Sequence, residues 1–202
     1  MNQDAAAAQR IGVFGGAFDP PHQGHVQLLQ SAIRQLALDT VLVIPTGEAW
    51  HKERGLTPAR HRLAMAQLAF GDQPQVQVDA REVERTGPSY TVDTLTELHA
   101  EHPGATFYLL MGQDQWRRFG TWRRPDEVAA LAIICVAFRA DPARAQADSK
   151  ADIAPPLSIA MPAVSASSTA IRSAVARHEG IDGLVFAPVA RYIEQHHLYQ
   201  NS

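Results

Sequence analysis

The sequence is poor in the features that mark secreted, membrane and nucleic-acid-binding proteins. Its 202 residues contain one cysteine, Cys135, so no disulfide can form within the chain, as is usual in a reducing compartment. No apolar run approaches the roughly 20 residues of a membrane helix. Residues 1–10 lack the basic start and apolar core of a signal peptide and are expected to be a frayed tail. The net charge of −3 gives no overall attraction for nucleic acid. We therefore expect a cytoplasmic protein with no membrane partner and no nucleic-acid partner.

Short apolar segments alternate with longer segments of helical periodicity. Six apolar segments have the length of strands, and most are continuously apolar, which is typical of parallel strands covered on both faces. They lie at 11–15, 40–45, 75–79, 106–112, 132–138 and 157–162. The alternation favours an α/β fold with a doubly wound parallel sheet and helices on both faces. We expect one domain over 11–199, with a long polar surface loop at 139–156 and a small C-terminal helical subregion at 163–199.

Neither of the two best-known phosphate-binding motifs is present. The chain contains no Gly-Lys pair, which excludes a Walker A loop, and its early glycines do not fit the dinucleotide fingerprint. However, Gly15 and Gly16 end the first predicted strand, where glycine lets the backbone approach a ligand and adopt torsions closed to other residues. A helix that begins near Gln23 would point its amide groups and positive dipole end at the same place. We expect an anion site there, most simply for phosphate.

Two histidines, His22 and His25, flank Gly24 at the start of this helix. Their spacing brings both imidazoles to one cavity, where they can donate hydrogen bonds to phosphate oxygens. A purely structural pair and a metal-binding pair are the alternatives. Asp19 is the only acidic residue nearby and no third histidine follows at zinc spacing, so we expect no metal held by the protein itself.

The same residues carry a family resemblance. The segment "GGAFDPPHQGH" resembles the G-x-F-D-P-x-H-x-G-H motif of the nucleotidyltransferase superfamily, and "VSASSTAIRSAV" (164–175) resembles the second motif of that superfamily, I-S-S-T-x-I-R. The resemblance implies a Rossmann-like fold in which His22 and His25 bind the phosphates of a nucleoside triphosphate and stabilise the transition state. A second phosphate cradle would be formed at another helix N-terminus by Ser167, Ser168, Thr169 and Arg172. Taken alone, that segment is equally well explained as an N-cap with a surface arginine.

Two further segments narrow the resemblance. "TGPSYTVDTLTEL" (86–98) and "LLMGQDQWRRFGTW" (109–122), with the ending "RYIEQHHLYQ", are similar to bacterial nicotinate mononucleotide adenylyltransferases. The amides before the helix that starts near Thr91 can bind a pyridine carboxylate. Trp122 offers a face to a pyridinium ring, although alone it would be read as a partly buried surface tryptophan. Asp114 follows a strand and could accept a hydrogen bond from a ribose hydroxyl, cap a helix, or both.

The resemblance implies two sets of contacts. Those with ATP are Gly15, Gly16, Ala17, Phe18, His22, His25, Lys52, Gly112, Asp114, Ser167, Ser168, Thr169 and Arg172. Those with nicotinate mononucleotide are Gly16, His51, Tyr90, Thr91, Asp114, Trp122 and Arg139. The chain departs from the family pattern at Ala17, which replaces the hydroxyl residue of Gly-Gly-Thr-Phe, and at "AWHKER" (49–54), which replaces Pro-Pro-His-Lys.

The reaction that the resemblance implies is ATP plus nicotinate mononucleotide giving nicotinate adenine dinucleotide plus pyrophosphate, a step of NAD biosynthesis. A phosphate monoester dianion is already a nucleophile, so the catalytic residues His22, His25 and Arg172 would position the reactants and stabilise charge. Mg²⁺ is expected on the triphosphate, held mostly by phosphate oxygens and water. The alternatives are nicotinamide mononucleotide or phosphopantetheine as the acceptor, and a nucleotide-binding module without transferase chemistry. A homo-oligomer stays open.

Overall fold

A six-stranded parallel sheet forms the centre of the molecule. The computed structural model describes residues 8–48, 55–138 and 154–200. The strand order is β3-β2-β1-β4-β5-β6, and every neighbouring pair is parallel. The strands are β1 Arg10–Gly16, β2 Thr40–Pro45, β3 Val76–Val78, β4 Thr106–Gly112, β5 Ile133–Phe138 and β6 Leu157–Ala160. This order is that of a doubly wound, Rossmann-like sheet, which confirms the predicted fold class.

Helices connect the strands and cover both faces of the sheet. The longer helices are α1 Gln23–Leu36, α2 Ala59–Phe70, α4 Thr91–Glu101, α7 Ser168–Ala176 and α8 Ala187–Gln195. The shorter ones are α3 Arg81–Glu84, α5 Gln113–Arg118, the 3₁₀ turn η1 Phe119–Thr121 and α6 Pro125–Leu131. The short helices are not visible as periodic segments in the sequence, because one or two turns do not establish a period. No helix of the described residues is long and apolar enough to cross a membrane.

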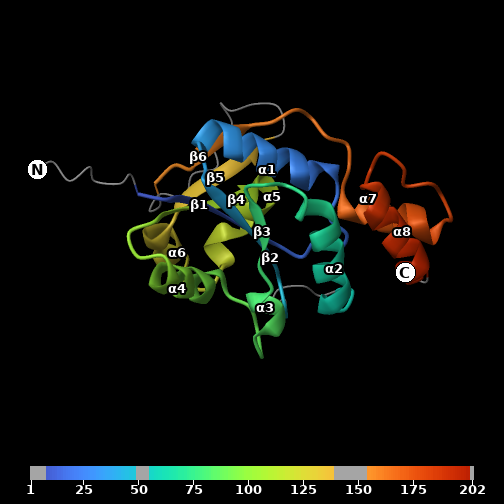
Figure 1. Cartoon of the computed structure of the whole chain (residues 1–202), viewed down its shortest axis with the longest axis horizontal. Coiled ribbons are helices and arrows are strands. Elements are labelled where there is room, and N and C mark those ends of the chain that lie inside the picture. Colours follow the sequence, from blue (N-terminus) through green and yellow to red (C-terminus); the bar gives the residue numbers. More distant parts are fainter. Residues whose placement is uncertain (1–7, 49–54, 139–153, 201–202) are drawn as a thin grey trace, which may run out of the picture.

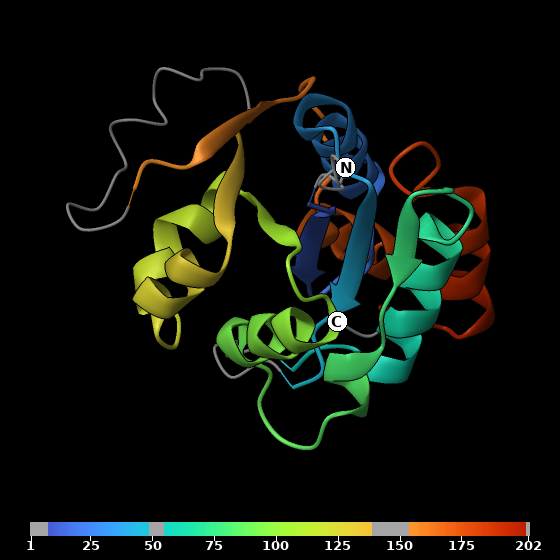
Figure 2. The ribbon, with the colours of Figure 1, turned by 60° about the vertical axis from the view of Figure 1, so that its left-hand side comes forward.

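Alternate side chains of the four inner strands, β1, β2, β4 and β5, enter two separate apolar layers. Val13 faces the layer under α4, α5 and α6, whereas its neighbour Phe14 faces the layer under α1 and α2. Figures 1 and 2 show α1 and α4 on opposite faces of the sheet. Because both faces are covered, the inner strands read as nearly continuous apolar runs, whereas the edge strands β3 and β6 contain exposed residues.

A third apolar cluster joins the C-terminal helices to α2. Met65 of α2 packs with Ile171 of α7 and with Val189 and Ile193 of α8. Figure 1 shows α7 and α8 beside α2, at one end of the molecule. The C-terminal helices α7 and α8 therefore share an apolar core with an earlier helix.

Several predicted boundaries are one or two residues off. β1 begins at Arg10, whose amide donates to Asp39 Oδ2 over 2.8 Å, so the last residue of the predicted tail belongs to the sheet. β6 ends at Ala160, two residues before Pro162, which cannot donate to a strand ladder. Residues 1–7 of the tail and 139–153 of the predicted loop lie outside the described residues, while 154–156 have no regular structure.

Candidate active site

A cavity of about 500 Å³ opens where the order of the strands switches between β1 and β4. Ligands bind at such switch points in parallel α/β sheets, beyond the carboxyl ends of the strands. Gly15 and Gly16 at the end of β1 and Met111 and Gly112 at the end of β4 form its floor. Residues at the first turns of α1, α4, α5 and α7 complete the wall. Helix N-termini carry a partial positive charge, so the cavity suits an anionic ligand.

The two histidines cap α1 reciprocally. The amide of Gly24 donates to His22 Nδ1 over 3.1 Å, and the amide of His22 donates to His25 Nδ1 over 3.1 Å. The two rings are stacked, with centroids 3.8 Å apart and planes 28° from parallel. This is a capping box built from imidazoles, which explains the three-residue spacing in the sequence. Because Nδ1 accepts in both rings, a neutral imidazole here carries its proton on Nε2, in the form that donates from the outer edge of the ring.

Gly24 and Phe18 fix the positions of the two rings. A Cβ atom on Gly24 would lie 3.0 Å from His22 Cε1 and 3.1 Å from Nδ1, so any other residue would force this ring to move by a few tenths of an ångström. Phe18 packs edge-on against His25, with ring centroids 5.2 Å apart. Phe18 has a φ of 47°, a strained conformation for a residue with a side chain, and it is buried. Strain held beside the paired histidines is typical of a functional loop.

The expectation for the torsions of Gly15 and Gly16 is wrong, because both lie in the extended backbone of β1 and neither has a positive φ. The expected close approach fits Gly15 better than Gly16. A Cβ atom on Gly15 would meet nothing within 4 Å, whereas one on Gly16 would lie 3.0 Å from the Phe18 ring. The open side of Gly15 faces the cavity that both glycines line.

The second motif packs directly on the first, although about 150 residues separate them in the chain. Ser167 caps α7 by accepting from the Ala170 amide over 3.2 Å. Ser168 Oγ donates to the carbonyl of Pro20 over 2.9 Å, and Arg172 Nη1 donates to the carbonyl of Asp19 over 2.7 Å. The predicted N-cap is confirmed, and the same segment brings its hydroxyls to the cavity beside the histidine loop.

The side chain of Asp19 holds the histidine loop in place through hydrogen bonds to distant segments of the chain. Its side chain is almost fully buried; Oδ1 accepts from the Tyr199 hydroxyl over 2.8 Å and Oδ2 from the Thr57 amide over 3.4 Å. Burial raises the pKa of Tyr199 above its ordinary value, and the negative charge of Asp19 and the bond to it add to the shift. Tyr199 therefore stays a hydrogen-bond donor at neutral pH, and the aspartate of the motif serves as a structural acceptor.

Arg62 of α2 ties three loops together. The fully buried guanidinium donates to the carbonyls of Ala17 over 3.0 Å, Gly47 over 2.9 Å and Thr57 over 2.8 Å. Burial lowers the pKa of Arg62, whereas nearby Asp19 and other acidic groups oppose that shift. Ala17 thus contributes through its backbone, which needs no hydroxyl side chain. The sequence gives no sign of this role, because an arginine between apolar helix positions reads as solvated.

The other side of the cavity is built on the N-terminus of α4. Tyr90 is the N-cap residue, with extended backbone, and its side chain makes no capping bond. Its carbonyl accepts from the amides of Asp93 and Thr94. Within the described residues, no hydrogen bond is found for the amides of Thr91 and Val92. Thr91 lines the cavity, so its amide can meet a carboxylate, whereas Val92 is fully buried.

The aromatic side chains of this region differ in what they face. The guanidinium of Arg123 lies over the Tyr90 ring, 4.7 Å from its centroid, and Tyr90 packs on the core. Trp122 packs on Phe119 with ring centroids 5.3 Å apart and also lines the cavity. Asp114 is exposed, lies in the first turn of α5 and lines the cavity; it is not the N-cap residue of that helix, which is Gly112.

The cavity gathers most of the predicted site residues. It is lined by Gly15, Gly16, Ala17, Phe18, His22, His25, Thr91, Gly112, Asp114, Trp122, Ser167, Ser168 and Thr169. Tyr90 and Arg172 are adjacent to lining residues but are not in the wall themselves. Arg172 Nη2 donates to Thr169 Oγ1 over 3.2 Å. His51, Lys52 and Arg139 lie outside the described residues. No group of three or more His, Cys, Asp or Glu side chains suited to a metal ion is found in the described ranges.

Sequence reasoning missed several lining residues. They include Glu82, Ser89, Thr94, Gln113, Gln115 and Met161. Glu82 follows no familiar motif and meets Thr94 only when α3 packs on α4. Ser89 and Thr94 lie within the quoted segment 86–98, and Gln113 and Gln115 lie within 109–122, so those segments were the signals that could have identified these side chains.

Comparisons with known proteins agree with this geometry. The family model of cytidylyltransferase-like proteins matches residues 13–174. A probable nicotinate-nucleotide adenylyltransferase of Albidiferax ferrireducens is 52% identical over 199 residues, covering 96% of this chain and 100% of the relative. One of Methylibium petroleiphilum is 40% identical, covering 97% of this chain and 95% of the relative. The fold matches a solved Plasmodium falciparum nicotinic acid mononucleotide adenylyltransferase complexed with NaAD, with a TM-score of 0.75, 18% identity, and coverage of 96% and 98% of the two chains.

The family model spans both the histidine loop and the second motif, and the relatives align over nearly their whole length. The chain belongs to the cytidylyltransferase-like family and, within it, to the nicotinate-nucleotide adenylyltransferases.

Proposed function

We propose that the protein transfers the adenylyl group of ATP to nicotinate mononucleotide, giving nicotinate adenine dinucleotide and pyrophosphate. The observation that carries the proposal is the pairing of two different helix N-termini at one cavity. The N-terminus of α1 presents two imidazoles, and that of α4 presents backbone amides beside Trp122. The first suits phosphates and the second suits a pyridine carboxylate. The names of the relatives at 52% and 40% identity support the same activity.

The chemistry needs no protein nucleophile. An oxygen of the acceptor 5′-phosphate attacks the α-phosphorus of ATP, the bond between that phosphorus and the α,β-bridging oxygen breaks, and pyrophosphate leaves. The outward Nε2–H groups of His22 and His25 donate to oxygens on which negative charge develops. Their Nδ1 atoms are fixed by backbone amides, so the donors are oriented before the substrate arrives. Ser167, Ser168 and Thr169 bring hydroxyls to the phosphates from beside the histidine loop.

Arg172 is proposed to contribute positive charge on the phosphate side of the cavity. Its guanidinium is bonded to the carbonyl of Asp19 and to Thr169 Oγ1. It lies next to the hydroxyls of the second motif, and its charge would favour a triphosphate or the leaving pyrophosphate. Lys52 and His51, in the segment that follows Glu48, are proposed to add contacts of the same kind.

The acceptor is recognised through its carboxylate. The Thr91 amide at the start of α4 suits an oxygen of a nicotinate carboxylate, whereas the NH₂ group of nicotinamide in that place would set a donor against a donor. The face of Trp122 would attract the positively charged pyridinium ring. Asp114 would accept from a ribose hydroxyl at the mouth of the cavity.

Mg²⁺ is proposed to enter as part of the ATP substrate. Among the described residues, the carboxylates in the cavity wall are those of Asp114 and Glu82, and Glu82 is engaged by neighbouring hydroxyls. Mg²⁺ usually keeps several waters and binds through substrate phosphates, which fits a wall with few acidic ligands. Cytoplasmic location stays a prediction of the sequence, and a homo-oligomer stays open.

The test is pyrophosphate release with Mg²⁺-ATP and, in turn, nicotinate mononucleotide, nicotinamide mononucleotide and phosphopantetheine. The proposal predicts turnover with the acid and a kcat/KM at least about tenfold lower with the amide, because a mismatched donor pair costs about 1–3 kcal/mol. Turnover that favours the amide or phosphopantetheine would contradict the assignment of the α4 amides. No turnover with any acceptor would contradict the transferase activity.

A further inference from the structure

Glu82 is a buried carboxylate in the wall of the cavity. It lies in α3, is 6% exposed, and lines the cavity close to Ser89 and Thr94. Burial raises its pKa above the ordinary value, while hydrogen bonds from Thr94 and Ser89 and the charge of Arg85 act in the opposite direction. A carboxylate is rarely buried without a specific set of partners, and the partners here all belong to the acceptor side of the site.

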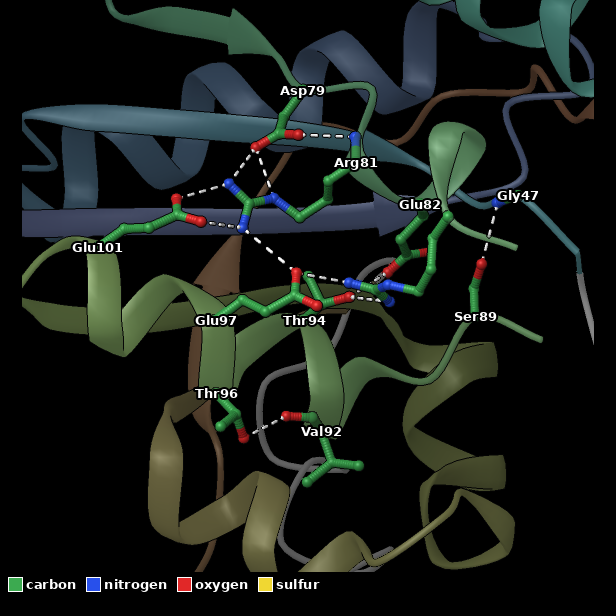
Figure 3. Close-up of polar contacts among 11 residues, drawn as sticks. Gly47, Asp79, Arg81, Glu82, Ser89, Val92, Thr94, Thr96, Glu97 and Glu101 are labelled. Carbon is green, nitrogen blue, oxygen red and sulfur yellow. Dashed lines mark hydrogen bonds and ion pairs between the residues drawn. The ribbon is translucent and has the colours of Figure 1, made fainter. Parts of the chain in front are cut away.

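Each of these partners fixes the start of α4. Thr94 Oγ1, one turn into the helix, donates to Glu82 Oε1 over 2.8 Å. The Ser89 hydroxyl, two residues before the helix, donates to the same carboxylate and accepts from the amide of Gly47 over 3.2 Å. Glu82 therefore contacts both sides of the segment that carries the Thr91 amide. Figure 3 shows the contact between Glu82 and Thr94 and the contact between the Ser89 hydroxyl and the Gly47 amide.

Gly47 makes the contact unusually close. A Cβ atom on Gly47 would lie 1.9 Å from the carbonyl oxygen of Glu82, so the two backbones touch. The carbonyl of Gly47 accepts from Arg62, which also holds the histidine loop through Ala17. Gly47 thus links the acceptor side of the cavity to the phosphate side.

Ion pairs hold α3 in place from outside. Arg81 donates to Asp79 over 2.8 Å and to both oxygens of Glu101 in α4 over 3.0 and 2.8 Å. Arg85 donates to Glu97 over 2.6 Å and to Thr94 over 3.3 Å. Figure 3 shows this row of contacts along one face of α4. The carboxylate of Glu82 is therefore the inner end of a polar network that docks α3 on α4.

We propose that Glu82 is a positioning residue for the acceptor: it holds Ser89 and Thr94 so that the amides at the start of α4 meet the carboxylate of the substrate. The inference rests on the proposed function and deepens it. Glu82 is proposed to act through Ser89 and Thr94, because its oxygens accept from these two hydroxyls.

The test compares Glu82→Gln with Glu84→Gln, which removes the same charge from the exposed face of the same short helix. For Glu82→Gln we expect the KM of nicotinate mononucleotide to rise about tenfold, the scale of one lost charge-assisted hydrogen bond, with the KM of ATP within about twofold. The ratio of kcat/KM for nicotinate mononucleotide to that for nicotinamide mononucleotide should fall as well. Glu84→Gln should change none of these values. Ser89→Ala should also raise the acceptor KM, and the double variant should show less than the product of the two effects.

The direction of the change in the acceptor KM distinguishes a positioning role of Glu82 from a purely electrostatic one. If Glu82 acted only as a negative charge near the cavity, its loss would strengthen binding of the negatively charged acceptor and lower its KM. A lowered acceptor KM, an unchanged one, or an equal rise for ATP and acceptor would each overturn the proposal. The wild-type acceptor panel is measured alongside, so the proposed function can fail separately: turnover only with another acceptor would overturn the assignment to nicotinate mononucleotide. A rise confined to that acceptor's KM would still locate Glu82 on its side of the cavity.

Discussion

The N-termini of α1 and α4 face the same cavity but differ in how they are capped. α1 is capped by side chains, because His22 and His25 accept from two backbone amides. α4 has no side-chain cap, and the side chain nearest to that role, Tyr90, lies under Arg123 instead. A helix end whose amides are taken by imidazoles presents imidazole donors to the ligand. A helix end without such a cap presents the amides themselves.

The difference matches the two kinds of anion that the site is proposed to bind. The Nε2–H groups of His22 and His25 are side-chain donors oriented by the bonds to their Nδ1 atoms, and they suit phosphoryl oxygens on which charge develops during the reaction. The carboxylate of the acceptor does not react, so a fixed backbone amide is sufficient to hold it. We infer that α1 serves the chemistry and α4 serves selection of the acceptor.

The largest expected effect comes from removing an imidazole at α1. His25→Ala should lower kcat by about 100-fold or more, because it deletes a donor aimed at charge that develops in the transition state. The acceptor KM should stay within about threefold, since α4 is untouched. Steady-state kinetics with both substrates varied checks this, with circular dichroism to confirm folding. A variant that kept nearly full kcat, or lost mainly acceptor affinity, would contradict the assignment of the chemistry to α1 and of acceptor selection to α4.

Disrupting the close contact between Gly47 and Glu82, which links the two sides of the cavity, should lower the stability of the protein. Gly47→Ala forces a Cβ atom to within 1.9 Å of the Glu82 carbonyl oxygen, so one of the two backbones must move. We expect the free energy of unfolding to fall by about 2 kcal/mol, as for other overpacked sites. Gly55→Ala is the matched control, because a Cβ atom there would meet nothing within 4 Å. Urea unfolding of both variants measures the difference, and equal stabilities would show that the Gly47 contact is not tight.

The smallest of these effects concerns the stacking face. Trp122→Leu should raise the KM of nicotinate mononucleotide about threefold to tenfold, the scale of a cation–π contact, and leave the KM of ATP nearly unchanged. Trp122→Phe keeps an aromatic face, so its KM for nicotinate mononucleotide should lie between the values of the wild type and of Trp122→Leu. If both variants changed the KM of ATP as much as that of the acceptor, Trp122 would belong to both subsites and the two sides of the cavity would not be separable.

The sequence was sufficient for the sheet and for the two motifs. β2 and β4 have the predicted bounds because long apolar strands end where polar residues or glycine begin. The start of α1 at Gln23 follows from the histidine loop, and the N-cap role of Ser167 follows from the hydroxyl run. These signals are local, so a single sequence carries them.

What the sequence could not give depends on contacts between distant segments. Glu82 stands among charged neighbours in "REVERTG" and looks solvated, yet packing of α3 on α4 buries it. Arg62 likewise becomes buried only where three loops converge. The φ of 47° at Phe18 has no sequence signal, because glycine is the residue usually expected at a positive φ.

The most direct test of acceptor selection by α4 removes the backbone amide of Thr91 while it keeps the helix. Thr91 is the first helical residue and follows the extended Tyr90, a place where proline is well tolerated. Calorimetric titration should compare nicotinate and nicotinamide mononucleotides with wild type, Thr91→Pro and Thr91→Ala. The account predicts that Thr91→Pro binds the acid about tenfold more weakly and loses the preference for acid over amide, whereas Thr91→Ala keeps that preference. An unchanged preference in Thr91→Pro would contradict selection of the acceptor by the amides of α4.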